Sequence, residues 1–277
     1  MQTNHVTIKP LAGAVGAEIG GIDLAGALSD GTIGEIRRIL AERGVVVFRD
    51  QTLTEAQHIA VARRFGEIDI NRFFVKAEGY PEIALVVKEP DQTANIGGGW
   101  HTDHSYDQNP ALGSMLYARE VPPVGGDTMF ASMYAAYDAL SDGLKHTLGG
   151  LRAVHSSRHV FGQDRPHLKG RVGNPAAATQ DAVHPVAITH PDSGKKALYV
   201  NPGFTLRFEG WTAEESQSLL SFLYRHAARP EFTCRLQWQN GSLAFWDNRS
   251  TWHYALNDYQ GERRLMHRIT IGGGPLH

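Results

Sequence analysis

Three side chains that can jointly bind a metal ion lie far apart in this chain, and their separation constrains the fold more than any other feature. His101 and Asp103 lie in the segment WHTD, and His253 follows about 150 residues later in the segment WDNRSTWHY. Residues i and i+2 of a β-strand point to the same side, so we expect His101 and Asp103 to point one way and Thr102 the other. A fold that adds His253 to this pair must bring two distant segments together.

Two imidazoles and one carboxylate on one face of a metal leave three coordination positions open, which is the arrangement of non-haem Fe(II) oxygenases. A 2-oxo acid can chelate two of these positions, and O2 can bind at the third. The same ligand types bind zinc in hydrolases, where the open position holds an activated water. A non-catalytic β-barrel that binds a ligand without chemistry is the alternative from another class. His101 and Asp103 alone are weak evidence for a metal site, because such pairs arise by chance in a chain with 14 histidines.

Basic residues that follow the third ligand help to separate these alternatives. Arg264 follows His253 by 11 residues, and Arg268 lies four residues further on. If residues 264–271 form a strand, both arginines share one face, and His267 points to the opposite side. Guanidinium groups bind carboxylates through paired hydrogen bonds, so this face is suited to hold a dicarboxylate. A clamp for a 2-oxo acid favours iron and 2-oxoglutarate over a zinc hydrolase or a non-catalytic barrel.

Several longer motifs resemble the taurine/2,4-D family of Fe(II)- and 2-oxoglutarate-dependent dioxygenases. They are WHTD at residues 100–103, PPVGGDT at 122–128, HPVAITHPDSGKKALYVNPGFT at 184–205, WDNRSTWHYALNDY at 246–259 and RRLMHRIT at 263–270. The opening PLAGAVGAEIGGIDL extends the resemblance over nearly the whole chain. The resemblance implies that His101, Asp103 and His253 bind Fe(II), and that 2-oxoglutarate and O2 are co-substrates with succinate and CO2 as products.

The same resemblance assigns the co-substrate contacts. It implies that Thr128 contacts the 2-oxoglutarate carboxylate and that Arg264 forms a salt bridge with it. Arg268 would lie beside both the co-substrate and the anionic group of the substrate. Related halogenases lack the metal-binding carboxylate, so the presence of Asp103 predicts hydroxylation rather than halogenation.

The substrate contacts depart from those of the taurine enzymes. Those enzymes place a His, a Tyr and an Asn around taurine, where this chain has Asn71, Phe74 and Gly97. The changes remove polar partners for an ammonium group and add apolar surface, and a buried ammonium without partners is costly. We therefore expect a small anionic substrate of the aryloxyalkanoate, alkyl sulfate or sulfonate type, whose oxidation can cleave a C–O or C–S bond. A taurine dioxygenase proper is the alternative.

The predicted substrate contacts form one set of polar and aromatic residues. His104 directly follows a ligand, so strand alternation would turn it away from the metal, whereas a turn would bring it to the pocket wall. Arg268 is expected to hold the anionic head, and aromatic residues the tail. The set is Asn71, Phe74, His104, Tyr106, Phe204 and Arg268, with Phe161 as a further aromatic candidate.

Short apolar strands separated by helical insertions predict a mainly β fold. We expect a double-stranded β-helix, the jelly-roll or cupin-like architecture, formed by one domain over residues 1–277. Residues 91–99 are polar and rich in glycine, and we expect them to act as a lid near the metal. The predicted strands are residues 45–48, 83–88, 232–237, 243–246 and 265–271, and the predicted helices are 31–43, 54–65, 132–140, 141–148 and 212–228.

Composition limits the partners and the compartment. The net charge is −2 and the sequence pI is about 6.7, which argues against a non-specific nucleic-acid binder. The single cysteine, Cys234, excludes an internal disulfide and suits a reducing compartment. No signal-peptide pattern and no apolar run long enough to span a bilayer stands out. We expect a cytoplasmic homo-oligomer whose partner is a small anionic molecule rather than a nucleic acid or a membrane.

Overall fold

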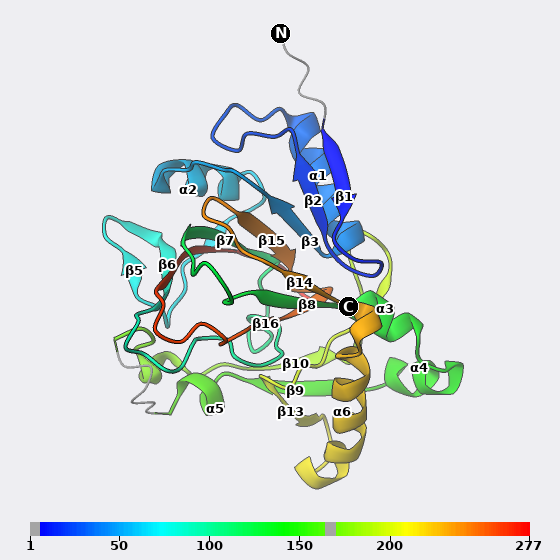
Figure 1. Ribbon diagram of the computed structural model, residues 1–277. Helices are drawn as coiled ribbons and strands as arrows, with labels where there is room; N and C mark the ends of the chain where they lie inside the picture. Colours follow the sequence, from blue (N-terminus) through cyan, green and yellow to red (C-terminus); the bar gives the residue numbers. More distant parts are fainter. Residues whose placement is uncertain (1–5, 164–169) are drawn as a thin grey trace.

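The computed structural model describes residues 6–163 and 170–277 (Figure 1). The helices in this part of the chain are α1 Asp30–Arg43, α2 Glu55–Arg63, α3 Met133–Asp138, α4 Asp142–Gly149, α5 Arg158–Phe161 and α6 Ala213–Ala227, with 3-10 turns η2 Pro175–Ala177 and η3 Pro230–Phe232. The strands are β1 Thr7–Pro10, β2 Ala17–Gly20, β3 Val45–Phe48, β4 Ile68–Asp69, β5 Lys76–Ala77, β6 Tyr80–Lys88, β7 Gly113–Glu120, β8 Thr128–Ser132, β9 Arg152–Ser156, β10 Asp181–Pro185, β11 Ala187–Thr189, β12 Lys196–Leu198, β13 Thr205–Phe208, β14 Thr233–Leu236, β15 Leu243–Asp247, β16 Thr251–Ala255 and β17 Arg264–Ile271.

Two sheets form the centre of the molecule. The larger one has the strand order β1-β2-β3-β15-β7-β17-β6-β5, with β4 paired to β17, and the smaller one has the order β14-β8-β16. Apolar side chains of both sheets meet in one buried cluster, in which Leu116 of β7 and Ala244 of β15 join Phe130 of β8 and Leu236 of β14. The predicted double-stranded β-helix is confirmed, with the two sheets as its walls.

Strand β3 shows how the sequence builds a sheet that is covered on both sides. All four of its residues are buried. Val45 and Val47 contact the cluster between the sheets, whereas Val46 and Phe48 contact a second cluster formed with α1 and α2. Successive side chains alternate between the two faces, so a short run of apolar residues contributes to two cores. Figure 1 shows α1 and α2 on the outer side of the large sheet, away from the small sheet.

Capping residues place the helices close to their predicted bounds. Ser29 and Thr54 accept backbone hydrogen bonds at the starts of α1 and α2, and Gly44 ends α1 with a φ of 72°. Helix α2 ends at Arg63, two residues before the predicted end at Phe65. Helix α6 begins with the predicted capping box of Thr212 and Glu215 and packs beside α3 and β13.

The five predicted strands are present and differ from the prediction at their ends, whereas others, among them β7, β8 and β16, were not predicted. Strand β6 begins at Tyr80, three residues earlier than expected, after a turn in which Gly79 has a φ of 75°. Strand β14 is preceded by the 3-10 turn Pro230–Phe232, so it begins at Thr233 rather than Phe232. In residues 6–163 and 170–277, the structure contains no helix long and apolar enough to cross a bilayer.

Candidate active site

The structure brings the three predicted metal ligands together at the open end between the two sheets. His253 lies on β16, and the ligand-bearing loop joins this strand through reciprocal backbone hydrogen bonds between His101 and His253 of 3.1 and 2.8 Å. Nε2 of His101 lies 3.7 Å from Asp103 Oδ1, and Nε2 of His253 lies 3.6 Å from Asp103 Oδ2. The three ligand atoms lie within 4.8 Å of one another, close enough for one ion to contact all of them.

The backbone at this site is not the regular strand that the sequence suggested. His101 forms an isolated bridge with His253, and a turn begins at Asp103. Thr102 points away as expected, and its hydroxyl donates to the Asn248 carbonyl at 2.6 Å. His104 has a φ of 58°, so the chain reverses directly after the ligand and brings His104 to the cavity wall. The expected strand at residues 101–103 is wrong, because pairing with β16 is limited to the single bridge at His101 and the chain turns from Asp103 onward.

The surroundings of both imidazoles suit them to bind a metal, through a hydrogen bond at His101 and through burial at His253. His101 donates its Nδ1 hydrogen to the Gly99 carbonyl at 2.8 Å, which leaves a lone pair on Nε2. Burial, with His101 close by, lowers the pKa of His253 well below its usual range. The His253 ring therefore stays neutral and can offer a lone pair. Two nitrogen donors and one carboxylate form a donor set that suits Fe(II).

Asp103 is held as a carboxylate inside the protein. Burial alone would raise the pKa of Asp103, but the charge of the Arg268 guanidinium outweighs burial and holds this pKa well below its usual range. Arg268 Nη2 lies 2.7 Å from Asp103 Oδ2 and donates to Ser114 Oγ at 3.1 Å, and Ser114 donates to the same Oδ2 at 3.3 Å. These contacts all engage Oδ2, whereas Oδ1 faces His101.

Two other groups of His and Asp occur in the described part of the chain, but each is already neutralised. In the group of Asp69, His104 and Asp107, Arg72 binds both carboxylate oxygens of Asp107 at 3.0 and 3.1 Å. In the group of His190, Asp192 and Asp247, both oxygens of Asp247 accept hydrogen bonds, most of them from Arg249. All three residues of the group containing His101 line one cavity of about 560 Å³.

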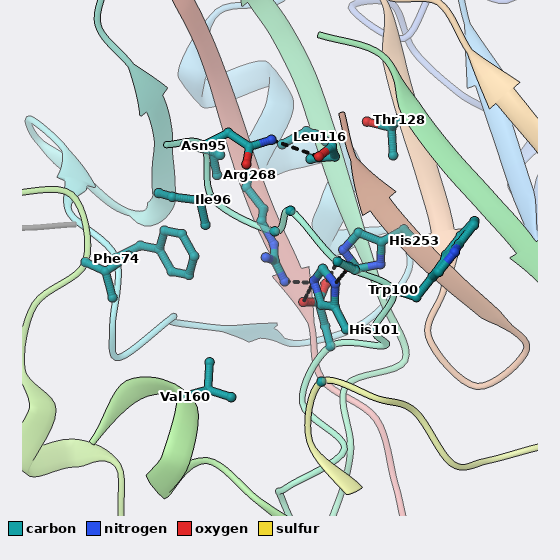
Figure 2. A pocket seen from close by; sticks show the side chains of 18 of the residues that line it. Phe74, Asn95, Ile96, Trp100, His101, Leu116, Thr128, Val160, His253 and Arg268 are labelled. Carbon is teal, nitrogen blue, oxygen red and sulfur yellow. Dashed lines mark hydrogen bonds and ion pairs between the residues drawn. The ribbon is translucent and has the colours of Figure 1, made fainter. Parts of the chain in front are cut away.

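A cavity of about 560 Å³ opens beside the candidate ligands. Figure 2 shows Arg268 reaching from β17 toward His101 and His253, with Phe74 and Val160 on one side and Thr128 on the other. All the predicted substrate residues line it: Asn71, Phe74, His104, Tyr106, Phe204 and Arg268, with Phe161 beside them. The site candidates that the sequence scattered over nearly 200 positions therefore share one cavity.

Arg264 and Thr128 form a second polar region in this cavity. Arg264 is buried on β17, and its Nε donates to the Gly126 carbonyl at 3.1 Å, while its Nη2 has no hydrogen-bond partner among the described residues. Burial lowers the pKa of Arg264. No carboxylate within residues 6–163 and 170–277 pairs with it at salt-bridge distance. A buried guanidinium with an unused donor favours an anionic ligand, and the distal carboxylate of 2-oxoglutarate fits this requirement.

Aromatic side chains form the wall opposite this polar region. Tyr106 and Phe204 meet edge to face with centroids 4.9 Å apart, and Phe73 stacks on Phe161 at 4.1 Å. The Arg268 guanidinium lies 5.8 Å from the centre of the Phe74 ring. Phe74, Tyr106 and Phe204 belong to one apolar cluster against which Phe161 packs. The Arg268 guanidinium lies beside this cluster.

Asn71 and Gly97 contribute to the cavity in different ways. Asn71 Oδ1 accepts hydrogen bonds from the backbone N–H groups of Phe73 and Phe74, at 2.9 and 3.1 Å. Because these donors require an acceptor, the orientation of the amide is set and its NH2 group is left for another acceptor. Gly97 has a φ of 81°, and a Cβ there would lie 3.3 Å from His101 Cε1. Gly97 thus allows the loop to approach the ligand but offers no side-chain contact.

The predicted lid segment is hydrogen-bonded on both sides of the cavity. Asn257 donates to the Thr93 carbonyl, Arg171 to the Ala94 carbonyl, and Asn95 to the Ala255 carbonyl, each at 2.8 Å. These bonds hold residues 91–99 over the cavity. Movement of the segment stays a prediction.

Three contributors could not be recognised from the sequence. Ser114 on β7 holds Asp103, and the Gly99 carbonyl orients His101. Trp238 donates its indole N–H to Thr128 Oγ1 at 2.9 Å. Trp238 lies in the connection between β14 and β15, where no periodic pattern marks a buried residue. The contacts of Ser114 and Trp238 join residues that are 11 and 110 positions apart along the chain.

Comparison with known proteins identifies the family of this chain. The model of the "Taurine catabolism dioxygenase TauD, TfdA family" matches residues 7–270. An alkylsulfatase from Acinetobacter baylyi is 36% identical, covering 98% of this chain and 86% of that protein. An alpha-ketoglutarate-dependent 2,4-dichlorophenoxyacetate dioxygenase from Cupriavidus pinatubonensis is 35% identical, covering 96% and 97%. The crystal structure of a taurine dioxygenase from Burkholderia xenovorans has a TM-score of 0.83 at 36% identity, covering 98% and 90%.

Proposed function

The chain belongs to the taurine catabolism dioxygenase TauD, TfdA family, and we propose that it oxidises an anionic sulfate ester or aryloxy acid with an apolar tail. As a member of this family it is an Fe(II)- and 2-oxoglutarate-dependent dioxygenase that acts on a small anionic organic substrate. Bound iron, with O2 and 2-oxoglutarate, supplies the oxidation of a substrate C–H group, and succinate and CO2 are released.

We assign the co-substrate and metal contacts to this chain's own residues. His101, Asp103 and His253 would hold the iron. Arg264 would pair with the distal carboxylate of 2-oxoglutarate, and the Thr128 hydroxyl would donate to it. Ser114 and Arg268 would keep Asp103 ionised and oriented, because both contact its Oδ2.

The charge of the cavity wall is the observation that carries the substrate assignment. Among the described residues that line the cavity, Asp103 is the one carboxylate, and it is engaged by Arg268 and reserved for the metal. The cations are Arg264 and Arg268. An anionic head group therefore finds a partner in Arg268 and in the Asn71 amide, whereas an ammonium group such as that of taurine finds no free carboxylate.

The apolar wall supports a tail on the substrate. Phe74, Tyr106 and Phe204 are all at least nine-tenths buried and belong to one apolar cluster, in which Tyr106 meets Phe204 edge to face and Phe74 lies beside Arg268. Burying apolar substrate surface against them contributes about 25 cal/mol per Å². A head held at Arg268 would direct the tail along these rings.

Oxidation next to a heteroatom would lead to cleavage. A sulfate ester hydroxylated on the carbon that bears the ester oxygen has a hydroxyl and a sulfate on one carbon. The hydroxyl loses its proton, a carbonyl forms, and the carbon–oxygen bond breaks as sulfate leaves with the electron pair. The same steps release a phenol from an aryloxy acid.

A direct comparison of substrates tests this proposal. We expect kcat/KM, followed as substrate-dependent succinate release, to be higher for hexyl sulfate or 2-phenoxypropionate than for taurine. Release of sulfate or phenol in equal amount to succinate would establish cleavage. A higher kcat/KM for taurine would overturn the assignment of Arg268 and the aromatic wall to head and tail.

Variants of the wall provide the matched control. Phe74→Ala should lower kcat/KM for hexyl sulfate more than for a short methyl or ethyl sulfate, because it removes apolar contact with the tail. Leu206→Ala removes an exposed side chain on β13 and should leave both values unchanged. Equal losses on short and long sulfates after Phe74→Ala would show that Phe74 does not contact the tail.

We also propose that residues 1–277 act as one catalytic domain in a cytoplasmic homo-oligomer. The single cysteine, Cys234, is buried and suits a reducing compartment. Partly exposed Leu206, Trp211 and Phe222 offer apolar area for contact between copies. Light scattering after size exclusion would give the mass, and a monomer of about 30.4 kDa would overturn the oligomer.

A further inference from the structure

Trp238 lies behind the region that we assign to the co-substrate. It is 7% exposed and belongs to the cluster between the two sheets. Its indole N–H donates to Thr128 Oγ1 at 2.9 Å, and its ring lies 5.7 Å from the guanidinium carbon of Arg264. One side chain therefore contacts both groups that we assign to the distal carboxylate.

The contact with Thr128 has a fixed direction. An indole nitrogen only donates, so the Thr128 oxygen must act as the acceptor in this bond. A hydroxyl has one hydrogen of its own, and that hydrogen cannot point at the indole. Thr128 lines the cavity, so its hydrogen is left to donate there. Trp238 thereby makes Thr128 a donor, which is the role that a carboxylate ligand requires.

The contact with Arg264 limits where the guanidinium can lie. Arg264 is 4% exposed, with one hydrogen bond to the Gly126 carbonyl and one unused nitrogen. An aromatic face attracts a cation and stabilises it where water is excluded. The indole ring thus supports the guanidinium from one side, and the carboxylate of a ligand would approach from the cavity.

From these contacts we infer that Trp238 is a positioning residue that prepares Thr128 and Arg264 for the distal carboxylate of 2-oxoglutarate. The inference rests on the proposed role of Arg264. It also implies selectivity for 2-oxo acids with a second carboxylate, because a monocarboxylic 2-oxo acid leaves Arg264 buried without a partner.

Equilibrium binding to the full-length, metal-loaded protein tests this inference without turnover. The dissociation constant of 2-oxoglutarate is measured by calorimetry under anaerobic conditions for wild type, Trp238→Phe, Thr128→Val and the double variant. Trp238→Phe keeps an aromatic ring beside Arg264 but loses the N–H group. We expect binding about 3- to 10-fold weaker in Trp238→Phe, the range of one neutral hydrogen bond.

The double variant separates positioning from a merely structural role. If Trp238 acts through Thr128, Trp238→Phe has little further effect once Thr128→Val has removed the hydroxyl. Independent, additive losses would overturn the inference. Trp211→Phe changes an exposed tryptophan, which lies outside the cavity, and should leave binding unchanged.

Two further measurements distinguish this inference from the proposed function. Unchanged 2-oxoglutarate binding in Arg264→Ala would reject the co-substrate site itself. Loss of binding in Arg264→Ala with unaltered binding in Trp238→Phe would reject only the role of Trp238. In steady state, Trp238→Phe should raise KM for 2-oxoglutarate while KM for the primary substrate stays unchanged, and equal rises in both would also reject it.

Discussion

Asp103 is the residue on which most polar contacts of the cavity converge. Both histidines, Ser114 and Arg268 approach its carboxylate. A buried carboxylate needs such partners, because desolvation otherwise favours its neutral form. The surrounding residues therefore keep Asp103 charged before any metal binds.

Removing one ligand should abolish metal binding and turnover together. Asp103→Ala or His101→Ala leaves two protein ligands, which hold the metal poorly. We expect loss of stoichiometric Fe(II) binding by anaerobic titration and loss of substrate-dependent succinate release. His146→Ala alters an exposed histidine of α4 and serves as the control. Full activity in a chelated, metal-free sample would contradict the assignment.

Replacing Arg264 tests its proposed role in binding 2-oxoglutarate. Arg264→Ala should raise KM for 2-oxoglutarate roughly 10- to 100-fold, since a hydrogen bond to a charged group contributes about 1.5–3 kcal/mol. Arg264→Lys should recover part of this loss, because it restores the charge without the paired donors. An unchanged KM in Arg264→Ala would mean that another residue, such as Arg268, holds the carboxylate.

Strand β17 shows how one element can serve both the core and the site. Arg264 and Arg268 line the cavity, whereas His267 lies on the opposite side, 3.9 Å from Glu55 of α2. The pairing with β7 shifts register between Leu265 and Met266 because β7 carries the extra residue Arg119, whereas β17 pairs with β6 without a break from Arg264 to Arg268. The alternation of a strand is enough to direct both guanidinium groups inward.

Helix α6 lies outside the cavity, so its cap can be tested separately from function. Thr212→Ala removes the side-chain oxygen that accepts from the Glu215 N–H and should destabilise the fold by about 1 kcal/mol. The melting temperature should fall by about 2–4 °C in a chain of this size, with kcat/KM unchanged. Thr212→Ser keeps the oxygen and should melt close to wild type. A melting temperature unaffected by Thr212→Ala would show that the cap does not limit stability.

The molecule as a whole buries several histidines in neutral form. His58 is fully buried under the large sheet, and neither ring nitrogen has a hydrogen-bond partner among the described residues. Burial, with smaller effects of His267 and Arg119, lowers the pKa of His58 to about 3. Burial also lowers the pKa values of His155 and His184.

These shifts predict that stability falls in mild acid. Between about pH 3 and 6.5 the unfolded chain binds a proton at His58 that the folded protein does not. The stability is fully present above pH 6.5, and it decreases as the pH falls, by up to about 1.4 kcal/mol per pH unit for each such histidine. Urea unfolding of wild type at pH 5 and pH 7 measures this decrease.

A His58 variant tests whether this residue causes the fall in stability at low pH. His58→Leu removes the titrating group from an apolar site, so the loss of unfolding free energy between pH 7 and pH 5 should be smaller than in wild type. His146→Ala, on the surface, should retain the wild-type loss. If His58→Leu and wild type lose the same free energy, His58 does not contribute to the pH dependence.

The sequence alone was sufficient for features that depend on local order along the chain. Short apolar runs such as residues 45–48 indicated strands, and capping residues such as Thr54 and Thr212 indicated where helices begin. The metal ligands and Arg264 were recognisable because few other functions require those residue types at that spacing. For the strands and caps a short stretch carries the information, since neighbours along the chain determine backbone geometry, whereas the ligands were recognised by residue type in motifs that lie far apart.

The tertiary structure decided what depends on contacts between distant segments. The turn that brings His104 to the cavity, the hydrogen bond from Trp238 to Thr128 and the position of Ser114 beside Asp103 have no local signal. The first is a backbone conformation that strand alternation does not reveal, and the other two join residues 110 and 11 positions apart along the chain. The charge of the cavity was likewise not evident from the sequence, because it depends on which carboxylates reach the wall and which are already paired with arginine elsewhere.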